Sequence, residues 1–227
     1  MTVRKARHGV LVGLSLLALV LPGVGYAGAD TVAPGVRAPA LASGSIGAVN
    51  IVVDGTPQAI PPIAECQTGA NQQASTPGVG VTDFVEFAAG STRCRASVVA
   101  WTTTATVTGG TFRLPGLRRY GGPLIRLASY RVTCAITTSG TEARFQFTGL
   151  NGFLAPSTVP RNHVVMIPGP AGSPPLARVT LNELVTPTPP DGSVRLNLMR
   201  IRLFPTTPSA APATGDIVVG SVHCDPS

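Results

Sequence analysis

Three consecutive residues, Arg118, Arg119 and Tyr120, form the best candidate for a ligand contact in this sequence. Guanidinium groups bind carboxylates and phosphates in a bidentate manner and also lie against aromatic rings. With Phe112 and Trp101 nearby in sequence, these side chains would suit a cell-wall polymer or a surface glycan. The opposing interpretation is a solvated loop tip, with Trp101 packed in the core as single tryptophans usually are.

Residues typical of nucleophilic catalysis are scarce. No G-x-S-x-G motif occurs, and only His163 and His223 follow the N-terminal region. A catalytic triad needs a nucleophile, a histidine and an acid held together. His223 directly precedes Cys224, but neighbouring residues of a strand point to opposite faces, so their side chains should diverge.

Two pairs of carboxylates would be the candidates for a glycosidase, which uses two acids around the bond that it cleaves. Asp83 and Glu86 are three residues apart in an expected strand and should face opposite ways. In the second pair, Glu183 and Asp191, we expect Glu183 and its neighbour Asn182 to bond a loop backbone instead. We therefore predict no catalytic residues and no enzymatic activity.

Four cysteines follow the N-terminal region, and an even number in an exported chain is typical of two disulfides. Three pairings are possible. We favour Cys66–Cys94, which would hold a long loop, and Cys134–Cys224, which would join the last strand to a central one. No C-x-x-C and no D-x-D-x-D-G spacing is present, so we expect neither a metal nor another cofactor.

Residues 1–29 are typical of a signal peptide. Arg4, Lys5 and Arg7 are positive, residues 10–21 are apolar or small, and Ala27-Gly28-Ala29 suits cleavage before residue 30. The apolar run is shorter than the roughly 20 residues that cross a bilayer. We expect no transmembrane segment after signal removal, and an extracellular or cell-surface location.

The remaining chain is expected to hold an exposed leader rich in Ala, Pro and Gly, residues 30–45, and one domain, residues 46–227. Lys5 is the only lysine, so 14 arginines face 10 acidic residues after signal removal. An arginine-only surface would suit bidentate binding of an anionic polymer, but GC-rich codon usage also explains it. Because the arginines are spread along the chain, nucleic-acid binding is not indicated.

Strands are the elements that must position these residues. Side chains alternate between apolar and polar in residues 81–87, 124–138 and 143–150 and in three runs between residues 176 and 224. With 26 Gly and 22 Pro, long helices are not expected. We predict an all-β, antiparallel two-sheet β-sandwich of about nine strands with long Pro/Gly-rich loops, such as residues 54–80.

The alternation reverses once, within the run from Val194 to Leu203. Leu196 and Leu198 share one face, whereas Met199 and Ile201 continue with the opposite parity. A flat strand cannot bury both sets on one side. Two explanations stay open: a β-bulge with one extra residue near position 198, or a strand that bends from one sheet into the other.

Several short motifs occur in an order that resembles the choice-of-anchor P proteins of actinobacteria. They are Pro160-Arg-Asn162, Val179-Thr-Leu-Asn-Glu183, the run at 193–201 and the run at 215–221. The resemblance covers roughly residues 46–224 and contains no catalytic signature. It implies an actinobacterial source and an exported or surface protein, in a family whose C-terminal anchors vary.

The molecular role of that family does not transfer to this chain. We expect a secreted or envelope-associated, non-enzymatic protein with a structural or adhesive role. The alternative is a module that binds carbohydrate or wall polymer. Because the sequence ends at Asp225-Pro-Ser227 without an apolar tail, we expect it to be freely secreted or held non-covalently at the wall.

Overall fold

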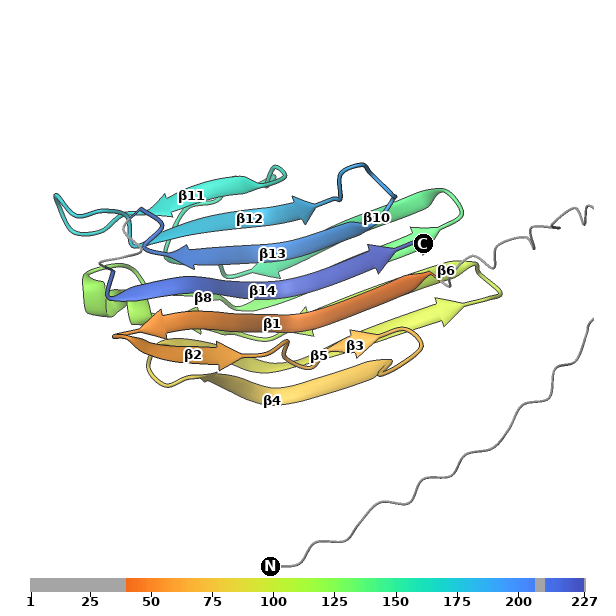
Figure 1. Cartoon of the computed structure of the whole chain (residues 1–227), viewed down its shortest axis with the longest axis horizontal. Helices are drawn as coiled ribbons and strands as arrows, with labels where there is room; N and C mark the ends of the chain where they lie inside the picture. The colour runs from red at the N-terminus through yellow and green to blue at the C-terminus, as the bar shows by residue number, and fades with distance from the viewer. Residues whose placement is uncertain (1–39, 207–210, 227) are drawn as a thin grey trace, which may run out of the picture. The chain divides into compact units, whose positions relative to one another are not determined.

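Antiparallel strands make up nearly all regular structure in the computed structural model, which describes residues 40–206 and 211–226 (Figure 1). They form two sheets of seven strands each, packed face to face. The predicted all-β, two-sheet sandwich is therefore confirmed. The three strand-like runs near the C-terminal end become three neighbouring strands of one sheet.

Sheet A contains both ends of the described chain. Its order is β11-β12-β13-β14-β1-β2, with β3 also paired to β1. The chain enters at β1 and leaves at β14, which lie side by side over 13 residues each. The strands are β1 (Leu41–Val53), β2 (Thr56–Ile60), β3 (Cys66–Gln67), β11 (His163–Ile167), β12 (Ala177–Val185), β13 (Val194–Leu203) and β14 (Ala213–Asp225).

Sheet B is formed by the middle of the chain. Its order is β10-β9-β6-β5-β7-β8, with β4 also paired to β5. A short 3-10 helix, η1 (Pro115–Tyr120), connects β7 to β8. The strands are β4 (Gln73–Val81), β5 (Val85–Ser97), β6 (Thr102–Gly109), β7 (Phe112–Leu114), β8 (Ile125–Leu127), β9 (Ser129–Thr137) and β10 (Gly140–Thr148).

Most of the strands beyond the expected nine lie in segments that were predicted to be loops. Residues 54–80 contain β2, β3 and most of β4, and β1 begins at Leu41, inside the expected leader. Both β2 and β4 bond to a neighbour on one side only, which is where proline is tolerated, as at Pro57 and Pro77. Pairing with β1 and β5 therefore outweighs the local Pro/Gly signal.

Both predicted disulfides are confirmed, and both join the two sheets. Cys66 of β3 bonds Cys94 of β5 with Cα atoms 5.7 Å apart, and Cys134 of β9 bonds Cys224 of β14 at 6.1 Å. All four sulfurs lie among the inward-facing apolar side chains of the two sheets. The core between the sheets is thus crossed by two covalent links.

Four strands of sheet A reverse their alternation along one line, which we call the crease: Ile46 in β1, Asn182 in β12, Leu198 in β13 and Gly220 in β14. Each ladder lacks a pair at this line and resumes in the same register beyond it. Leu181 pairs with Met199, for example, and Glu183 with Asn197. No extra residue is inserted, so the predicted bulge is wrong, and so is the alternative of a strand that changes sheets.

The backbone explains the reversal in two of the four strands, β12 and β14. Asn182 and Gly220 have φ angles of 52° and 61°, in the left-handed region rather than the extended one. A single residue outside the extended region changes which face the following side chains occupy. All four strands reverse their alternation at the same line. Neighbouring strands therefore stay in register, and the buried side chains face the core on both sides of the crease.

Tyr130 from sheet B packs against the crease. Its hydroxyl donates a hydrogen bond of 2.8 Å to the carbonyl oxygen of Ile46, and burial raises the pKa of this phenol. The Ile46 amide is satisfied by the carbonyl of Ile63 at 2.9 Å. The polar backbone atoms freed at this point of β1 therefore find partners inside the protein.

Candidate functional site

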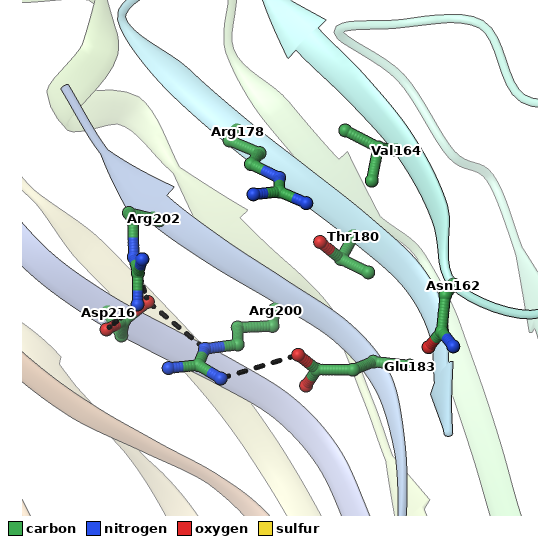
Figure 2. Close-up of a pocket in the computed structure, with 8 residues that line it drawn as sticks. All are labelled: Asn162, Val164, Arg178, Thr180, Glu183, Arg200, Arg202 and Asp216. Atoms are coloured by element: carbon green, nitrogen blue, oxygen red, sulfur yellow. Dashed lines mark hydrogen bonds and ion pairs between the residues drawn. The ribbon is translucent and has the colours of Figure 1, made fainter. Parts of the chain in front are cut away.

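A shallow hollow of about 200 Å³ lies on the outer face of sheet A beside the crease (Figure 2). Three arginines and two acids from three adjacent strands dominate its lining, with smaller contributions from Asn162, Val164 and Thr180. We call it the arginine hollow, defined by Arg178, Glu183, Arg200, Arg202 and Asp216.

Arg200 occupies the centre of the charged network. Its Nε lies 3.1 Å from Oδ1 of Asp216, and its Nη1 lies 3.4 Å from Oε1 of Glu183. Arg202 shares the Asp216 carboxylate at 3.3 Å. The hydrogen bond to Asp216 is the main cause that raises the pKa of Arg200, so this guanidinium remains charged. Asp216 and Glu183 together hold it in one orientation.

The crease brings Glu183 and Arg200 onto the same face. The Asn197 amide donates a 2.6 Å hydrogen bond to Oε2 of Glu183, whose other oxygen binds Arg200. Asn197 and Arg200 are three residues apart, so in an uninterrupted strand their side chains would point to opposite faces. The reversal at Leu198 is therefore what assembles the hollow.

Arg178 differs from the other two arginines of the hollow. In the ladder between β12 and β13 it lies directly opposite Arg202, and on its other side it faces Met166. Like charges directly opposite one another are destabilising. Among residues 40–206 and 211–226, no carboxylate lies within ion-pair distance of Arg178. Figure 2 shows its guanidinium beside the hollow, with no bond to the residues drawn.

The charge balance of the arginine hollow favours an anion. The hollow contains three guanidinium groups and two carboxylates, so it carries a net positive charge. The two acids are already engaged by arginines, whereas a glycosidase needs one carboxyl that is free to act as its acid. The arrangement is suited to holding a phosphate, sulfate or carboxylate group rather than to proton transfer.

The expected partners of Asn182 and Glu183 are half confirmed. The Asn182 amide donates to the carbonyl of Val159 in a neighbouring loop at 3.1 Å, as predicted. Glu183 instead binds the side chains of Asn197 and Arg200. Asp191 accepts a hydrogen bond from the Ser193 amide at 2.8 Å, and bonding to Ser193 lowers its pKa.

The candidate residues Arg118, Arg119 and Tyr120 lie on η1, at the opposite end of the sandwich from the β5–β6 turn (Figure 1). Both arginines are exposed, but Tyr120 packs edge-on against Phe204 with ring centroids 5.2 Å apart. Burial raises the pKa of Tyr120, and its hydroxyl has no hydrogen-bond partner in the described part of the chain.

The two aromatic residues grouped with this motif are not part of such a site. Phe112 is completely buried. Trp101, which was expected in the core, is 76% exposed in the turn between β5 and β6, so that prediction is wrong. Its φ of 48° belongs to the turn, and a turn residue has no facing sheet to pack against.

The other residues considered for chemistry stay apart. Cys224 faces the core in its disulfide while His223 lies on the outer face, so the predicted divergence is confirmed. Glu86 pairs with Arg113 at 3.3 Å, and Asp83 lies in a turn. In the described ranges no three His, Cys, Asp or Glu side chains are grouped as metal ligands.

Comparison with family models, curated proteins and solved structures finds no match to this chain. Within residues 40–206 and 211–226, no helix has the length and apolar character needed to cross a bilayer. Functional inference therefore depends on the geometry and charge of the molecule itself. Sequence reasoning missed the arginine hollow, although Arg200 and Arg202 alternate visibly with apolar residues in one strand.

Proposed function

We propose that this chain is an exported, envelope-associated binding module without enzymatic activity, which holds an anionic wall polymer in the arginine hollow. One observation carries the proposal: Arg178 lies directly opposite Arg202 and has no acid of its own in the described chain. A phosphate or carboxylate between these two guanidiniums would relieve their repulsion and accept hydrogen bonds from both.

The size of the hollow favours a polymer over a free small molecule. At about 200 Å³ it is below the range of roughly 300–1,000 Å³ typical of small-molecule pockets. It has room for one charged group of a larger ligand. A wall polymer presents such groups repeatedly, so that a protein released from one group can bind again at the next. Binding of this kind would give the protein a structural or adhesive role.

Export is supported by the N-terminal residues and by the disulfides. Residues 1–29 have the charge and apolar pattern of a signal peptide. Two disulfides with no free cysteine in the described chain suit an oxidising compartment outside the cytoplasm. Both features are consistent with function at the cell envelope.

The test is sedimentation of the protein with purified actinobacterial cell walls. We expect Arg178→Ala to weaken binding by roughly ten- to a hundredfold, because a charge-assisted hydrogen bond contributes about 1.5–3 kcal/mol. Arg178→Lys should give an intermediate loss of binding, since lysine keeps the positive charge but lacks the planar guanidinium group that binds an anion with two hydrogen bonds. Wild-type binding should weaken as salt is raised.

The matched control is Arg118→Ala combined with Arg119→Ala, which removes two exposed positive charges from η1. This variant should bind cell walls nearly as well as the wild type. Because Arg178 makes no ion pair in the described chain and faces Arg202, Arg178→Ala should leave the unfolding midpoint unchanged or raise it slightly. Equal retention of Arg178→Ala and wild type would refute the arginine hollow as the binding site.

A further inference from the structure

The turn between β5 and β6 presents three large apolar side chains to solvent. Val98, Val99 and Trp101 are 82%, 90% and 76% exposed, and we call these three residues the apolar tip. The last pair of the hairpin ladder is Ser97 with Thr102, so the tip lies beyond the end of the sheet. Figure 1 shows this hairpin, in yellow-green, reaching past the neighbouring strand ends.

The turn is closed by a hydrogen bond between a backbone amide and a side chain of the same turn. The Ala100 amide donates a 3.1 Å hydrogen bond to the hydroxyl of Ser97, which closes the turn locally. The apolar side chains are therefore displayed by a closed turn on a regular hairpin. A contiguous, protruding apolar group of this kind is typical of an interaction site rather than of ordinary surface.

The chemistry of the apolar tip favours lipid over sugar. Binding of a glycan requires polar groups placed around the aromatic ring. Next to Trp101 the turn offers two valines and an alanine, and the Ser97 hydroxyl is occupied by the Ala100 amide. Trp is enriched where a bilayer meets water, because its ring is apolar and its N–H is polar. Valine side chains are suited to the acyl region just below.

The charge around this hairpin is complementary to an anionic membrane. Residues 87–141 contain no Asp or Glu, and the acids on either side, Glu86 and Glu142, are already paired with Arg113 and Arg144. The exposed side chains of Arg93 and Arg95 precede the tip on β5.

We propose that the apolar tip inserts into the interfacial layer of an anionic lipid bilayer, while the exposed Arg93 and Arg95 of β5 attract the protein to it. Peripheral binding of this type combines buried apolar area with attraction to charged headgroups. The inference uses none of the residues of the arginine hollow. It adds a second contact with the envelope that does not depend on the wall polymer.

The experiment uses the protein's own fluorescence, because Trp101 is the only tryptophan in the chain. Vesicles of phosphatidylglycerol and phosphatidylcholine should shift the Trp101 emission to the blue and protect it from a water-soluble quencher. Pure phosphatidylcholine vesicles should do so much less, and salt should weaken the effect. Unchanged emission with the anionic vesicles, or an equal response to the neutral ones, would overturn the proposal.

Val99→Asp keeps the fluorescent probe and places a charge at the tip, so we expect about tenfold weaker vesicle binding, or about 1.4 kcal/mol. The matched control is Leu154→Asp, which alters a side chain that is 93% exposed elsewhere, and it should bind like the wild type. Equal losses in both variants would indicate non-specific adsorption of the protein surface and would contradict specific insertion of the apolar tip.

Four further measurements separate this inference from its alternatives. A blue shift without vesicles that grows with protein concentration would mean that the apolar tip binds a second copy of the protein. A blue shift caused by soluble wall glycan would mean that Trp101 stacks on sugar. Either result would overturn the proposal of membrane binding. Arg178→Ala should leave vesicle binding intact, and Val99→Asp should leave cell-wall binding intact. The failure of the wall-binding proposal can therefore be distinguished from the failure of the membrane-binding proposal.

Discussion

Tyr130 shows how one residue links the two sheets through a polar contact. Its ring lies against Gly109, to which it is paired in the ladder between β6 and β9, and where any side chain would collide with it. Its hydroxyl reaches across the core to the carbonyl of Ile46 at the crease. A buried carbonyl without a partner is costly, so this single hydrogen bond helps to keep the crease in place.

Replacing Tyr130 with Phe should therefore lower the free energy of unfolding by about 1–2 kcal/mol, because the Ile46 carbonyl loses its donor. Urea denaturation followed by circular dichroism measures the change. Tyr120→Phe is the control, since the Tyr120 hydroxyl has no partner in the described chain and its removal should be neutral or slightly stabilising. Equal losses in the two variants would contradict the assigned role of Tyr130.

At the scale of elements, the crease is the feature that gives sheet A its functional face. Each of the four strands carries one residue that reverses its alternation, and the four residues align. Were only one strand to reverse, its side chains would no longer match those of its neighbours. The common line keeps the core continuous and brings outward-facing polar residues from both sides toward each other, as in the contact between Glu183 and Arg200.

Gly220 is the single glycine of the crease, and we expect it to be hard to replace. A Cβ there would combine a φ of 61° with contacts at 2.9 Å to Val132 and 3.1 Å to Tyr130. Gly55 in the β1–β2 turn has a φ of 76° but open space around it. Gly220→Ala should thus cost about 1–3 kcal/mol more than Gly55→Ala, which carries only the backbone strain of about 1–2 kcal/mol.

Chemical denaturation of both glycine variants tests this expectation. The Gly55→Ala variant serves as the control for a positive φ without crowding. A destabilisation of Gly220→Ala no larger than that of Gly55→Ala would show that the space beside Tyr130 and Val132 can adapt. In that case the crease would depend on backbone conformation alone.

At the scale of the whole molecule, the disulfides join the sheets at positions that differ greatly in chain separation. Cys134 and Cys224 are 90 residues apart, whereas Cys66 and Cys94 are 28 apart. Cross-links restrict the unfolded chain more strongly when they close a longer loop. The Cys134–Cys224 link also ties the last strand, β14, to the middle of sheet B.

We expect the double variant Cys134→Ala/Cys224→Ala to lose more stability than Cys66→Ala/Cys94→Ala, about 4.6 against about 3.6 kcal/mol by the chain-entropy relation. All four cysteines are fully or almost fully buried, so the loss of packing is similar in both variants. Thermal and guanidinium unfolding under non-reducing conditions provide the comparison. The reverse order would mean that native packing, rather than the unfolded chain, dominates.

Alternation of side chains, the number of cysteines and the N-terminal charge pattern are local properties, and they were enough to predict the fold class and the pairing of the cysteines. Alternation at Tyr130, Val132 and Cys134 marks an inward face whatever the rest of the chain does. The parity change at Leu198 was also visible. Its cause was not, because one strand alone cannot show that its neighbours reverse at the same line.

Only the tertiary structure decided which charged residues meet and which apolar residues remain in solvent. Arg178 and Arg202 become neighbours through the register of β12 and β13, and Trp101 is exposed because a turn carries it beyond the sheet. Edge strands such as β2 and β4 also depend on a partner strand rather than on their own Pro-containing sequences. Which face of a strand points inward follows from the local pattern, whereas contacts between strands depend on register, which is set by packing of the whole sheet.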